Sequence, residues 1–426
     1  MDPAQQRFET LFGPEFGHGK PFDLAPLRAT LAALGDPQAH LPPVIHVAGT
    51  NGKGSTIAFM RAIAEAAGLR VHAFTKPHLF ALRERFAVAN EQVSETALIA
   101  AAEHVARIST ALTQFDAQVA AAFLLFDETP ADLVLLETGM GGRDDSTNVI
   151  ERPALSVITP IGLDHQDALG ATLAEIAAHK AGIMKRNSPA IVARQDDAVR
   201  KMIEAQAEAV GAPLYRQGVE WDAYASNGHL VVQTETRALD LPLPALAGAH
   251  QIDNAGLACA ALLTWRPALS EEAFAAGMTD AAWPARLQPL MRGPLSAPIR
   301  NTGGEVWVDG GHNAHGAQAL AHALNAMRHR REAPTIAIVG MLARKHADSF
   351  AAALAGAVDR IIAVPLQQAH IAPNLIAAQA EALGVAASTA PSLEAAMQDA
   401  AQFPAPRVLI CGSFVLAAEA LTAESA

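Results

Sequence analysis

The stretch VIHVAGTNGKGSTIAF, residues 44–59, constrains the fold of this chain more than any other segment. An apolar strand predicted over 43–48 runs into a glycine-rich loop, and a helix is predicted from about Ser55 until Gly68 stops it. In α/β proteins this order forms a phosphate-binding loop, because backbone N–H groups and the helix N-terminus face the phosphate oxygens. The spacing departs from G-x-x-x-x-G-K-[ST], since Val47 stands at the first glycine position and Gly54 follows the lysine. The alternative is a glycine-rich turn with a solvated lysine.

Short apolar runs alternate with alanine-rich helical segments along the chain. Three continuous runs have strand length, as buried parallel strands do when helices cover both faces of a sheet: 132–138, 154–160 and 189–194. The stretch 215–244 alternates instead around Asn227–Gly228, which predicts a hairpin. The strand–helix alternation restarts after the proline-rich stretch 283–298. We therefore predict two α/β domains with mostly parallel sheets, 1–284 and 285–426.

Composition narrows the class of partner. The 426 residues carry a net charge of −12, which disfavours binding to nucleic acid or to an anionic membrane. The apolar stretch 117–126 is too short for a membrane span and predicts a buried helix. The N-terminal stretch shows no signal peptide, and two cysteines, Cys259 and Cys411, are too few for a disulfide framework. We expect a cytoplasmic monomer.

Polar side chains follow several predicted strands. Glu137 ends one strand, where a carboxylate could hold Mg²⁺ or be an ordinary strand-end residue. His165 follows another, as a metal ligand or a structural histidine. Lys180 lies in an apolar helix end, HKAGIMK, where periodicity predicts an ammonium that reaches out to solvent. The spacing of His312 and His315 suits a zinc pair, but the absence of a third ligand nearby disfavours it.

Ten short blocks, taken in order, resemble the folylpolyglutamate synthase/dihydrofolate synthase family of Mur-type ATP-dependent amide ligases. They are HVAGTNGKGST, PHL with ER, LETGMGGRDDSTN, LDHQDALG, HKAGI, GAHQIDNA, PARLQ, VDGGHN, VGMLARK and CGSF. The phosphate loop of this family reads G-T-N-G-K-G-[ST], so Gly54 belongs to the pattern. The resemblance implies an α/β fold with an N-terminal P-loop ATP-binding domain of the Mur ligase type and a smaller, Rossmann-like C-terminal domain.

The same resemblance implies roles for the residues that match family motifs. It implies ATP contacts by Gly52, Lys53, Gly54, Ser55, Asn254, Arg286, Asp309 and His312. It implies Mg²⁺, at two sites, on Ser55, Glu137, His165 and a carbamylated Lys180. It implies a pterin pocket made of Thr113, Gln114, Phe115, Asp145 and Ser146. The implied catalytic residues are Lys53, Lys180 and Arg286.

Three residues depart from the family pattern. Lys76 stands where the family has the serine of Ser-Pro-His-Leu, which is associated with a metal site. An ammonium cannot ligate Mg²⁺, so Lys76 could instead neutralise phosphate charge. His179 replaces a glutamate before the carbamylated lysine, and Ala285 replaces a glycine before Arg286.

The reaction implied is ATP-dependent ligation of L-glutamate to dihydropteroate and to the γ-carboxylate of reduced folates. A substrate carboxylate attacks the γ-phosphate of ATP to give an acyl phosphate and ADP, and the amine of glutamate then displaces phosphate. Three alternatives stay open: a monofunctional folylpolyglutamate synthase, a cell-wall UDP-muramoyl ligase, and a non-catalytic nucleotide-binding regulatory module. Lys76 and His179 keep the last alternative open.

Overall fold

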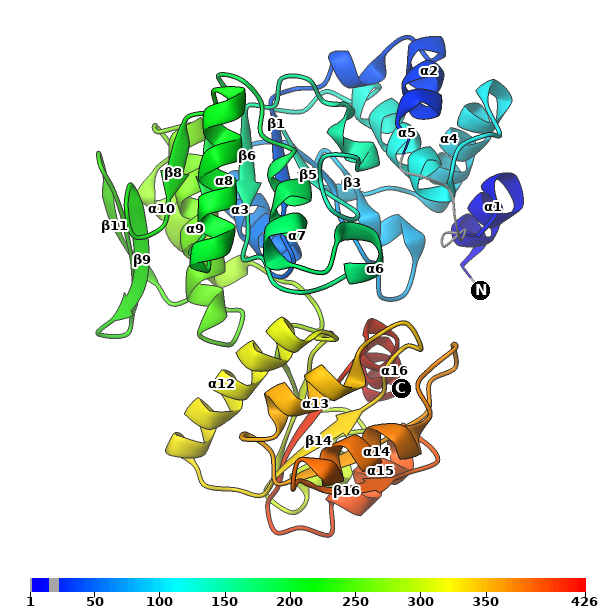
Figure 1. Ribbon diagram of the computed structural model, residues 1–426, viewed down its shortest axis with the longest axis vertical. Coiled ribbons are helices and arrows are strands. Elements are labelled where there is room, and N and C mark those ends of the chain that lie inside the picture. Colours follow the sequence, from blue (N-terminus) through cyan, green and yellow to red (C-terminus); the bar gives the residue numbers. More distant parts are fainter. Residues whose placement is uncertain (1, 15–22) are drawn as a thin grey trace. The chain divides into compact units, whose positions relative to one another are not determined.

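The computed structural model describes residues 2–14 and 23–426. Residues 1 and 15–22, which include part of the N-terminal stretch considered for a signal peptide, lie outside them. The chain forms two compact units, one of Met1–Ala245 with Ile252–Ala282 and one of Leu246–Gln251 with Trp283–Ala426. Both combine parallel strands with helices, which confirms the predicted α/β class (Figure 1).

The first unit is built on an eight-stranded sheet. Its spatial order is β4 (Glu91–Gln92), β3 (Phe86–Val88), β2 (Val71–Phe74), β5 (Leu133–Glu137), β1 (Val44–Ala48), β6 (Leu155–Ile158), β7 (Ala190–Val192) and β8 (Leu214–Arg216). The neighbours in the series β2, β5, β1, β6, β7 and β8 pair in parallel, whereas β3 pairs antiparallel with both β2 and β4. Every residue of β1, β5 and β6 is buried, as continuous apolar runs predict.

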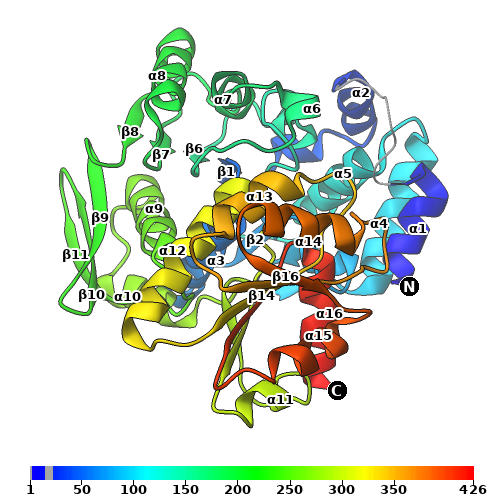
Figure 2. The same cartoon turned by 60° about the horizontal axis from the view of Figure 1, so that its bottom comes forward.

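Helices cover this sheet in separate groups. One core cluster joins α1 (Pro3–Phe12), α2 (Ala25–Ala33), α4 (Glu95–Ile108) and α5 (Gln114–Asp127) to strand residues such as Val134 and Leu136. A second cluster joins α7 (Leu173–Ala181) and α8 (Asp197–Val210) to β6 and β7. In Figures 1 and 2, α1 and α4 lie beside each other and away from α8. The apolar stretch 117–126 lies in α5 and is buried throughout, as predicted.

The remaining helices of the first unit include the one that follows the glycine loop. This helix, α3 (Lys53–Ala66), packs against α10 (Glu271–Asp280) so closely that a Cβ on Gly277 would lie 2.3 Å from Ile63 Cγ1. The others are α6 (Gln166–Leu169), α9 (His250–Trp265), and the 3₁₀ turns η1 (Pro37–Ala39), η2 (Leu82–Arg85) and η3 (Ser146–Val149). No helix in the described ranges is both long and apolar enough to span a bilayer.

The predicted hairpin is confirmed. Strands β9 (Trp221–Ser226) and β10 (His229–Thr234) pair antiparallel around Asn227 and Gly228, whose φ angles are 52° and 82°. Two positive φ angles at the tip are the signature of a type I′ turn, which Asn-Gly favours. A third strand, β11 (Ala238–Pro242), adds to β10.

The second unit holds a six-stranded sheet in the order β12 (Gln288–Leu290), β13 (Glu305–Val308), β17 (Arg407–Cys411), β14 (Thr335–Val339), β15 (Arg360–Ala363) and β16 (Ala386–Thr389). All pairs are parallel except that of β12 with β13. Its helices are α11 (Ala297–Arg300), α12 (Ala314–Arg330), α13 (Ala347–Leu354), α14 (Pro373–Ala382), α15 (Leu393–Ala400) and α16 (Phe414–Ser425). The strand–helix alternation predicted to restart after 283–298 is formed by β13, β14, β15 and β17 with the helices between them.

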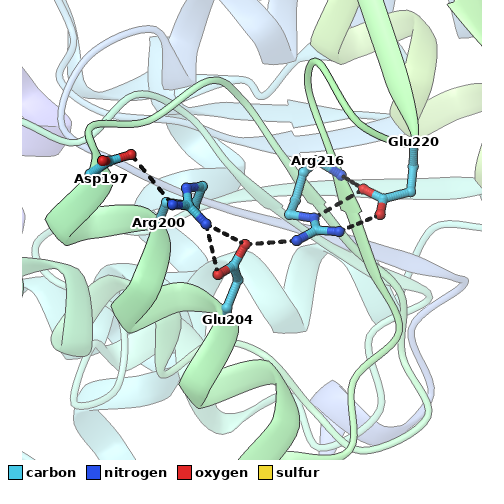
Figure 3. A network of polar contacts seen from close by, with 5 residues as sticks. All are labelled: Asp197, Arg200, Glu204, Arg216 and Glu220. Carbon is cyan, nitrogen blue, oxygen red and sulfur yellow. Dashed lines mark hydrogen bonds and ion pairs between the residues drawn. The ribbon is translucent and has the colours of Figure 1, made fainter.

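Two polar clusters fix the ends of elements. In the first unit, Arg216 forms ion pairs with Glu204 at 2.7 Å and with Glu220 at 2.6 Å (Figure 3). Arg200 pairs with Glu204 and Asp197. The pair between Arg216 of β8 and Glu204 of α8 links the strand to the helix.

In the second unit, the Glu424 carboxylate of α16 closes the loop before α11. It accepts the backbone N–H groups of Arg292, Gly293 and Ser296, at 3.2, 2.7 and 2.9 Å. The Ser296 hydroxyl adds a fourth hydrogen bond at 2.8 Å. The Glu424 side chain therefore accepts hydrogen bonds from three backbone N–H groups that have no partner within a strand or helix.

Candidate functional site

The glycine loop has the geometry of an anion-binding cradle. Gly52, with φ 92°, precedes α3, which begins at Lys53, two residues earlier than predicted. A Cβ on Gly49 would lie 1.8 Å from Thr159 Oγ1, and a Cβ on Gly52 would lie 2.4 Å from Asn254 Oδ1. Both positions therefore require glycine, and the close approach of Asn254 brings this predicted ATP contact onto the loop.

Contacts with the segment after β6 hold the loop in place. The backbone N–H groups of Thr50 and Asn51 donate to Pro160 O at 3.0 and 3.4 Å. The Thr50 hydroxyl donates to Gly162 O at 3.0 Å and accepts from Gly162 N at 3.1 Å. Because the segment after β6 supports it, the loop is preorganised for phosphate oxygens.

Glu137 lies beside the loop lysine. It ends β5, the neighbour of β1, so both strands deliver their last residues to the same edge of the sheet. Its Oε1 lies 3.8 Å from Lys53 Nζ, and its Oε2 accepts the backbone N–H of Lys76 at 3.0 Å. The ammonium of Lys53 also donates to Gly49 O at 3.1 Å and to Thr50 O at 3.3 Å. A cation and a carboxylate thus adjoin the cradle, which fits a nucleotide with its divalent metal.

Lys180 does not reach solvent, so the prediction from periodicity was wrong. Its side chain is 4% exposed at the end of α7, and its Nζ donates to Gly49 O at 2.7 Å. The buried ammonium of Lys180 therefore points toward the phosphate loop and not toward solvent. Burial, followed by the positive charge of Lys53, lowers the pKa of Lys180 from 10.5 to about 7. Two carboxylates, Asp164 and Asp145, oppose the shift.

His165 lies at the end of the segment that follows β6. Its φ of 54° is left-handed, and its backbone N–H donates to Asp164 Oδ1 at 2.9 Å. Its ring is 42% exposed and lies 3.9 Å from Asp164 Oδ2, whereas Asp164 is only 12% exposed. Asp164 is therefore the more enclosed side chain of the two, and its position next to the histidine is the sequence signal that could have identified it. His179 pairs with Asp144 at 3.4 Å.

Hydrogen bonds join the two segments predicted to hold a pterin, which are the start of α5 and η3. Thr113 caps α5 and exchanges hydrogen bonds with Asp116, whose Oδ2 accepts the threonine hydroxyl at 2.6 Å. The Ser146 hydroxyl donates to Asp116 Oδ1 at 2.6 Å. Asp116 therefore links the start of α5 to η3, and the capping-box pattern T-x-x-D was the signal that could have identified it.

Asp145 is buried within a hydrogen-bonded chain. Its Oδ1 accepts both the backbone N–H and the hydroxyl of Thr147, at 3.0 and 2.6 Å, and its Oδ2 accepts Met140 N at 2.7 Å. The Thr147 oxygen in turn lies 2.8 Å from His46 Nε2 in β1. Burial raises the pKa of Asp145, and the positive charge of Lys76 opposes that shift.

Phe115 presents an aromatic surface in the same region. Its ring packs against Gly139, where a Cβ would lie 2.4 Å from Cζ, and its centroid lies 6.0 Å from that of Phe74. The Lys76 ammonium lies 4.7 Å from the centroid. Gln114 is fully buried, and neither its amide oxygen nor its amide nitrogen has a hydrogen-bond partner. A buried amide in this state is suited to a polar ligand or a bound water.

The predicted residues of the second unit lie around the Phe414 ring and the first turn after β13. Arg286 lies over the Phe414 ring at 4.9 Å, and the His312 ring lies 5.6 Å from the same ring. Asp309 accepts Leu287 N at 2.7 Å and Gly311 N at 2.6 Å, so its carboxylate fixes the backbone on both sides. Ala285 and Leu287, the neighbours of Arg286, have φ angles of 57° and 41°. Such left-handed backbone at non-glycine residues is typical of functional segments.

Within residues 2–14 and 23–426, no group of three or more His, Cys, Asp or Glu side chains is placed to hold a metal. His312 and His315 therefore gain no third ligand of these types from the described chain. The residues predicted to hold Mg²⁺ include Ser55 and Lys180, which belong to other types. Ser55 is buried in the first turn of α3, where its hydroxyl is suited to a hard cation that also binds phosphate.

Comparison with known proteins gives matches over both units. The Mur ligase middle domain matches residues 47–262, and the Mur ligase, glutamate ligase domain matches residues 297–414. The dihydrofolate synthase/folylpolyglutamate synthase of Escherichia coli is 34% identical, over 93% of this chain and 90% of its own length. That of Bacillus subtilis is 36% identical over 74% and 73%.

Solved structures agree with these matches. E. coli FolC in complex with DHPP and ADP superposes with a TM-score of 0.85 at 30% identity, over 98% of this chain and 96% of that one. A bifunctional folylpolyglutamate synthase/dihydrofolate synthase from Yersinia pestis, complexed with AMPPNP and Mn ion, gives 0.86 at 31% identity, over 100% and 99%. A further structure of such an enzyme holds Mn, AMPPNP and L-glutamate; it gives 0.83 at 31% identity, over 96% and 95%.

Proposed function

This chain belongs to the Mur ligase family and, within it, to the dihydrofolate synthase/folylpolyglutamate synthases, and on that premise we propose that it joins L-glutamate to dihydropteroate and to reduced folates at the expense of ATP. The observation that carries the proposal is the phosphate cradle with Glu137 and Lys180 at its sides. The structures of relatives with DHPP and ADP, and with Mn, AMPPNP and L-glutamate, support the same substrates.

The residues of the first unit position the reactants. Gly49, Gly52 and the N-terminus of α3 bind the phosphates of ATP, and Lys53 neutralises the γ-phosphate while the acceptor carboxylate attacks it. Glu137 and Ser55 would hold Mg²⁺, which would withdraw charge from the phosphate oxygens. The attack forms a carboxyl oxygen–phosphorus bond and releases ADP. The amine of glutamate then forms the amide bond, and phosphate leaves.

We also propose that Lys180 is carbamylated. Its lowered pKa leaves a large neutral fraction at neutral pH, and only the neutral amine attacks CO₂. Attack forms the N–C bond and releases one proton, which turns a cationic side chain into an anionic metal ligand. The carbamate nitrogen keeps one hydrogen, so the bond to Gly49 O at 2.7 Å is compatible with the modification. With ¹³CO₂, wild type should show a carbamate ¹³C signal that Lys180→Gln lacks.

One assay decides the function. Purified protein receives Mg²⁺-ATP and L-glutamate with dihydropteroate or with tetrahydrofolate, and both ADP and the amide product are measured. We expect product from both acceptors, and a loss of at least about 100-fold in Lys53→Met but not in Lys201→Met, on the exposed side of α8. Product from tetrahydrofolate alone indicates a monofunctional synthase. ADP formation with only a UDP-muramoyl acceptor, or ATP binding without turnover, refutes the proposal.

A cytoplasmic location and a monomeric state complete the proposal. ATP and reduced folates are cytoplasmic substrates, and the residues predicted for the site in the first unit all belong to one chain. Size-exclusion chromatography with light scattering tests the monomer, for which we expect a mass near 44.5 kDa.

A further inference from the structure

Lys76 occupies a position between two parts of the predicted site. It follows β2, and its backbone N–H donates to Glu137 Oε2 at 3.0 Å. The other oxygen of that carboxylate lies 3.8 Å from Lys53 Nζ. Lys76 is therefore separated from the lysine of the phosphate loop by one carboxylate.

The side chain of Lys76 turns toward the aromatic part of the site. Its Nζ lies 4.7 Å from the centroid of Phe115, within the range of a cation–π contact. Its charge also acts on Asp145, the buried carboxylate at the start of η3. The same residue thus touches the metal-binding carboxylate through its backbone and the aromatic surface through its ammonium.

The other two lysines at this edge have different contacts. Lys53 donates to two carbonyls of the phosphate loop, and Lys180 donates to one of them, Gly49 O, from the end of α7. Lys76 is the lysine that lies on the Phe115 side. An acceptor that places its ring at Phe115 must direct its carboxylate toward Lys53, where the γ-phosphate is bound, and this path runs along Lys76.

We propose that Lys76 binds the carboxylate of the acceptor and so determines the preference of this site for an anionic acceptor. The inference rests on the proposed function. An ammonium forms a charge-assisted hydrogen bond with a carboxylate oxygen, and it orients the second oxygen toward the phosphorus atom before the attack. A long, unbranched side chain can leave the face of Phe115 to make this bond without any movement of the backbone.

Binding of two acceptors that differ only in charge tests the proposal. Calorimetry measures dihydropteroate and its carboxamide on the enzyme saturated with Mg²⁺-AMPPNP, in wild type, Lys76→Met and the matched control Lys201→Met. We expect wild type and the control to bind the acid about 10- to 100-fold more tightly than the amide, as for a hydrogen bond between charged groups. In Lys76→Met the preference should fall to about 2-fold, with the affinity for the amide unchanged.

Steady-state kinetics provide a second measurement. Lys76→Met should raise KM for dihydropteroate about 10-fold or more while KM for ATP stays within about 2-fold, and Lys76→Arg should keep part of the affinity. Retention of the full preference for the acid in a folded Lys76→Met variant overturns the inference. So does a weaker affinity for AMPPNP with that preference intact, which would place Lys76 on the phosphates. Failure of wild type to form any amide refutes the proposed function instead.

Discussion

Replacement of His46 should make the stability of the first unit less sensitive to acid. His46 is fully buried in β1, and its Nδ1 has no hydrogen-bond partner. The Thr147 hydroxyl donates to Asp145, so its oxygen accepts and His46 Nε2 must carry the hydrogen. Protonation would add an unpaired N–H at Nδ1. Burial, together with the charge of Lys185, lowers the pKa of His46 from 6.5 to about 3.

The sign and size of the effect follow from linkage. The unfolded chain binds the proton near pH 6.5 and the folded chain only near pH 3, so the contribution to stability is complete above pH 6.5 and is lost as the pH falls toward 3. At pH 5 the solution lies roughly 1.5 units below the unfolded pKa, and about 1.4 kcal/mol per unit gives a loss of about 2 kcal/mol.

Urea unfolding at pH 7 and pH 5 measures the loss. His46→Gln keeps a donor toward Thr147 but does not titrate, and His40→Gln is the control, because His40 is 58% exposed beside Asp127. Between the two pH values, wild type and the control should lose about 2 kcal/mol more free energy of unfolding than His46→Gln. Equal losses in all three proteins would show that the ring is protonated in the folded state, which refutes the hydrogen-bond assignment.

Three further substitutions test other parts of the structure. Gly52→Ala should weaken Mg²⁺-AMPPNP binding about 10-fold or more in calorimetry, since a Cβ there meets a buried amide at 2.4 Å, whereas Gly68→Ala, with an open surrounding, should leave it unchanged. Glu424→Ala leaves three N–H groups of segment 292–296 without their acceptor and should lower the unfolding free energy of the second unit by about 1–3 kcal/mol in urea titrations. Asp116→Ala separates the start of α5 from η3 and should raise KM for dihydropteroate about 10-fold with KM for ATP unchanged; an equal rise in both values contradicts this.

The sequence was sufficient for the elements whose local signal agrees with their final environment. The apolar runs at β1, β5 and β6 are buried on both faces, and Asn227–Gly228 forms the predicted turn. It was insufficient for β16, whose residues AAST carry neither an apolar run nor an alternating pattern, and whose pairing depends on β15. The formation of such a strand depends on pairing with its neighbour and not on the β-propensity of its own residues.

The sequence indicated where several candidate site residues lie, but not which contacts they make with one another. The glycine loop and Glu137 follow from motif and strand position, because parallel strands end at one edge. Lys180 was misassigned by periodicity, since a helix pattern cannot show that a polar residue on the apolar side faces Gly49 O. The roles of Asp116 and Thr147 depend on contacts between distant segments, which residue spacing alone does not specify.

The position of β1 has a consequence for synthesis on the ribosome. The strand that leads into the phosphate loop emerges early, yet both of its neighbours are encoded much later: Val44 pairs with Val134, and Ile45 pairs with Leu155. Until β5 and β6 leave the exit tunnel, a largely apolar strand has exposed edges, and the closure of such long-range pairings is slow. We expect the nascent chain to depend on chaperones until about the end of β6 has been synthesised. Bound nucleotide should slow unfolding of the nascent chain only after that point.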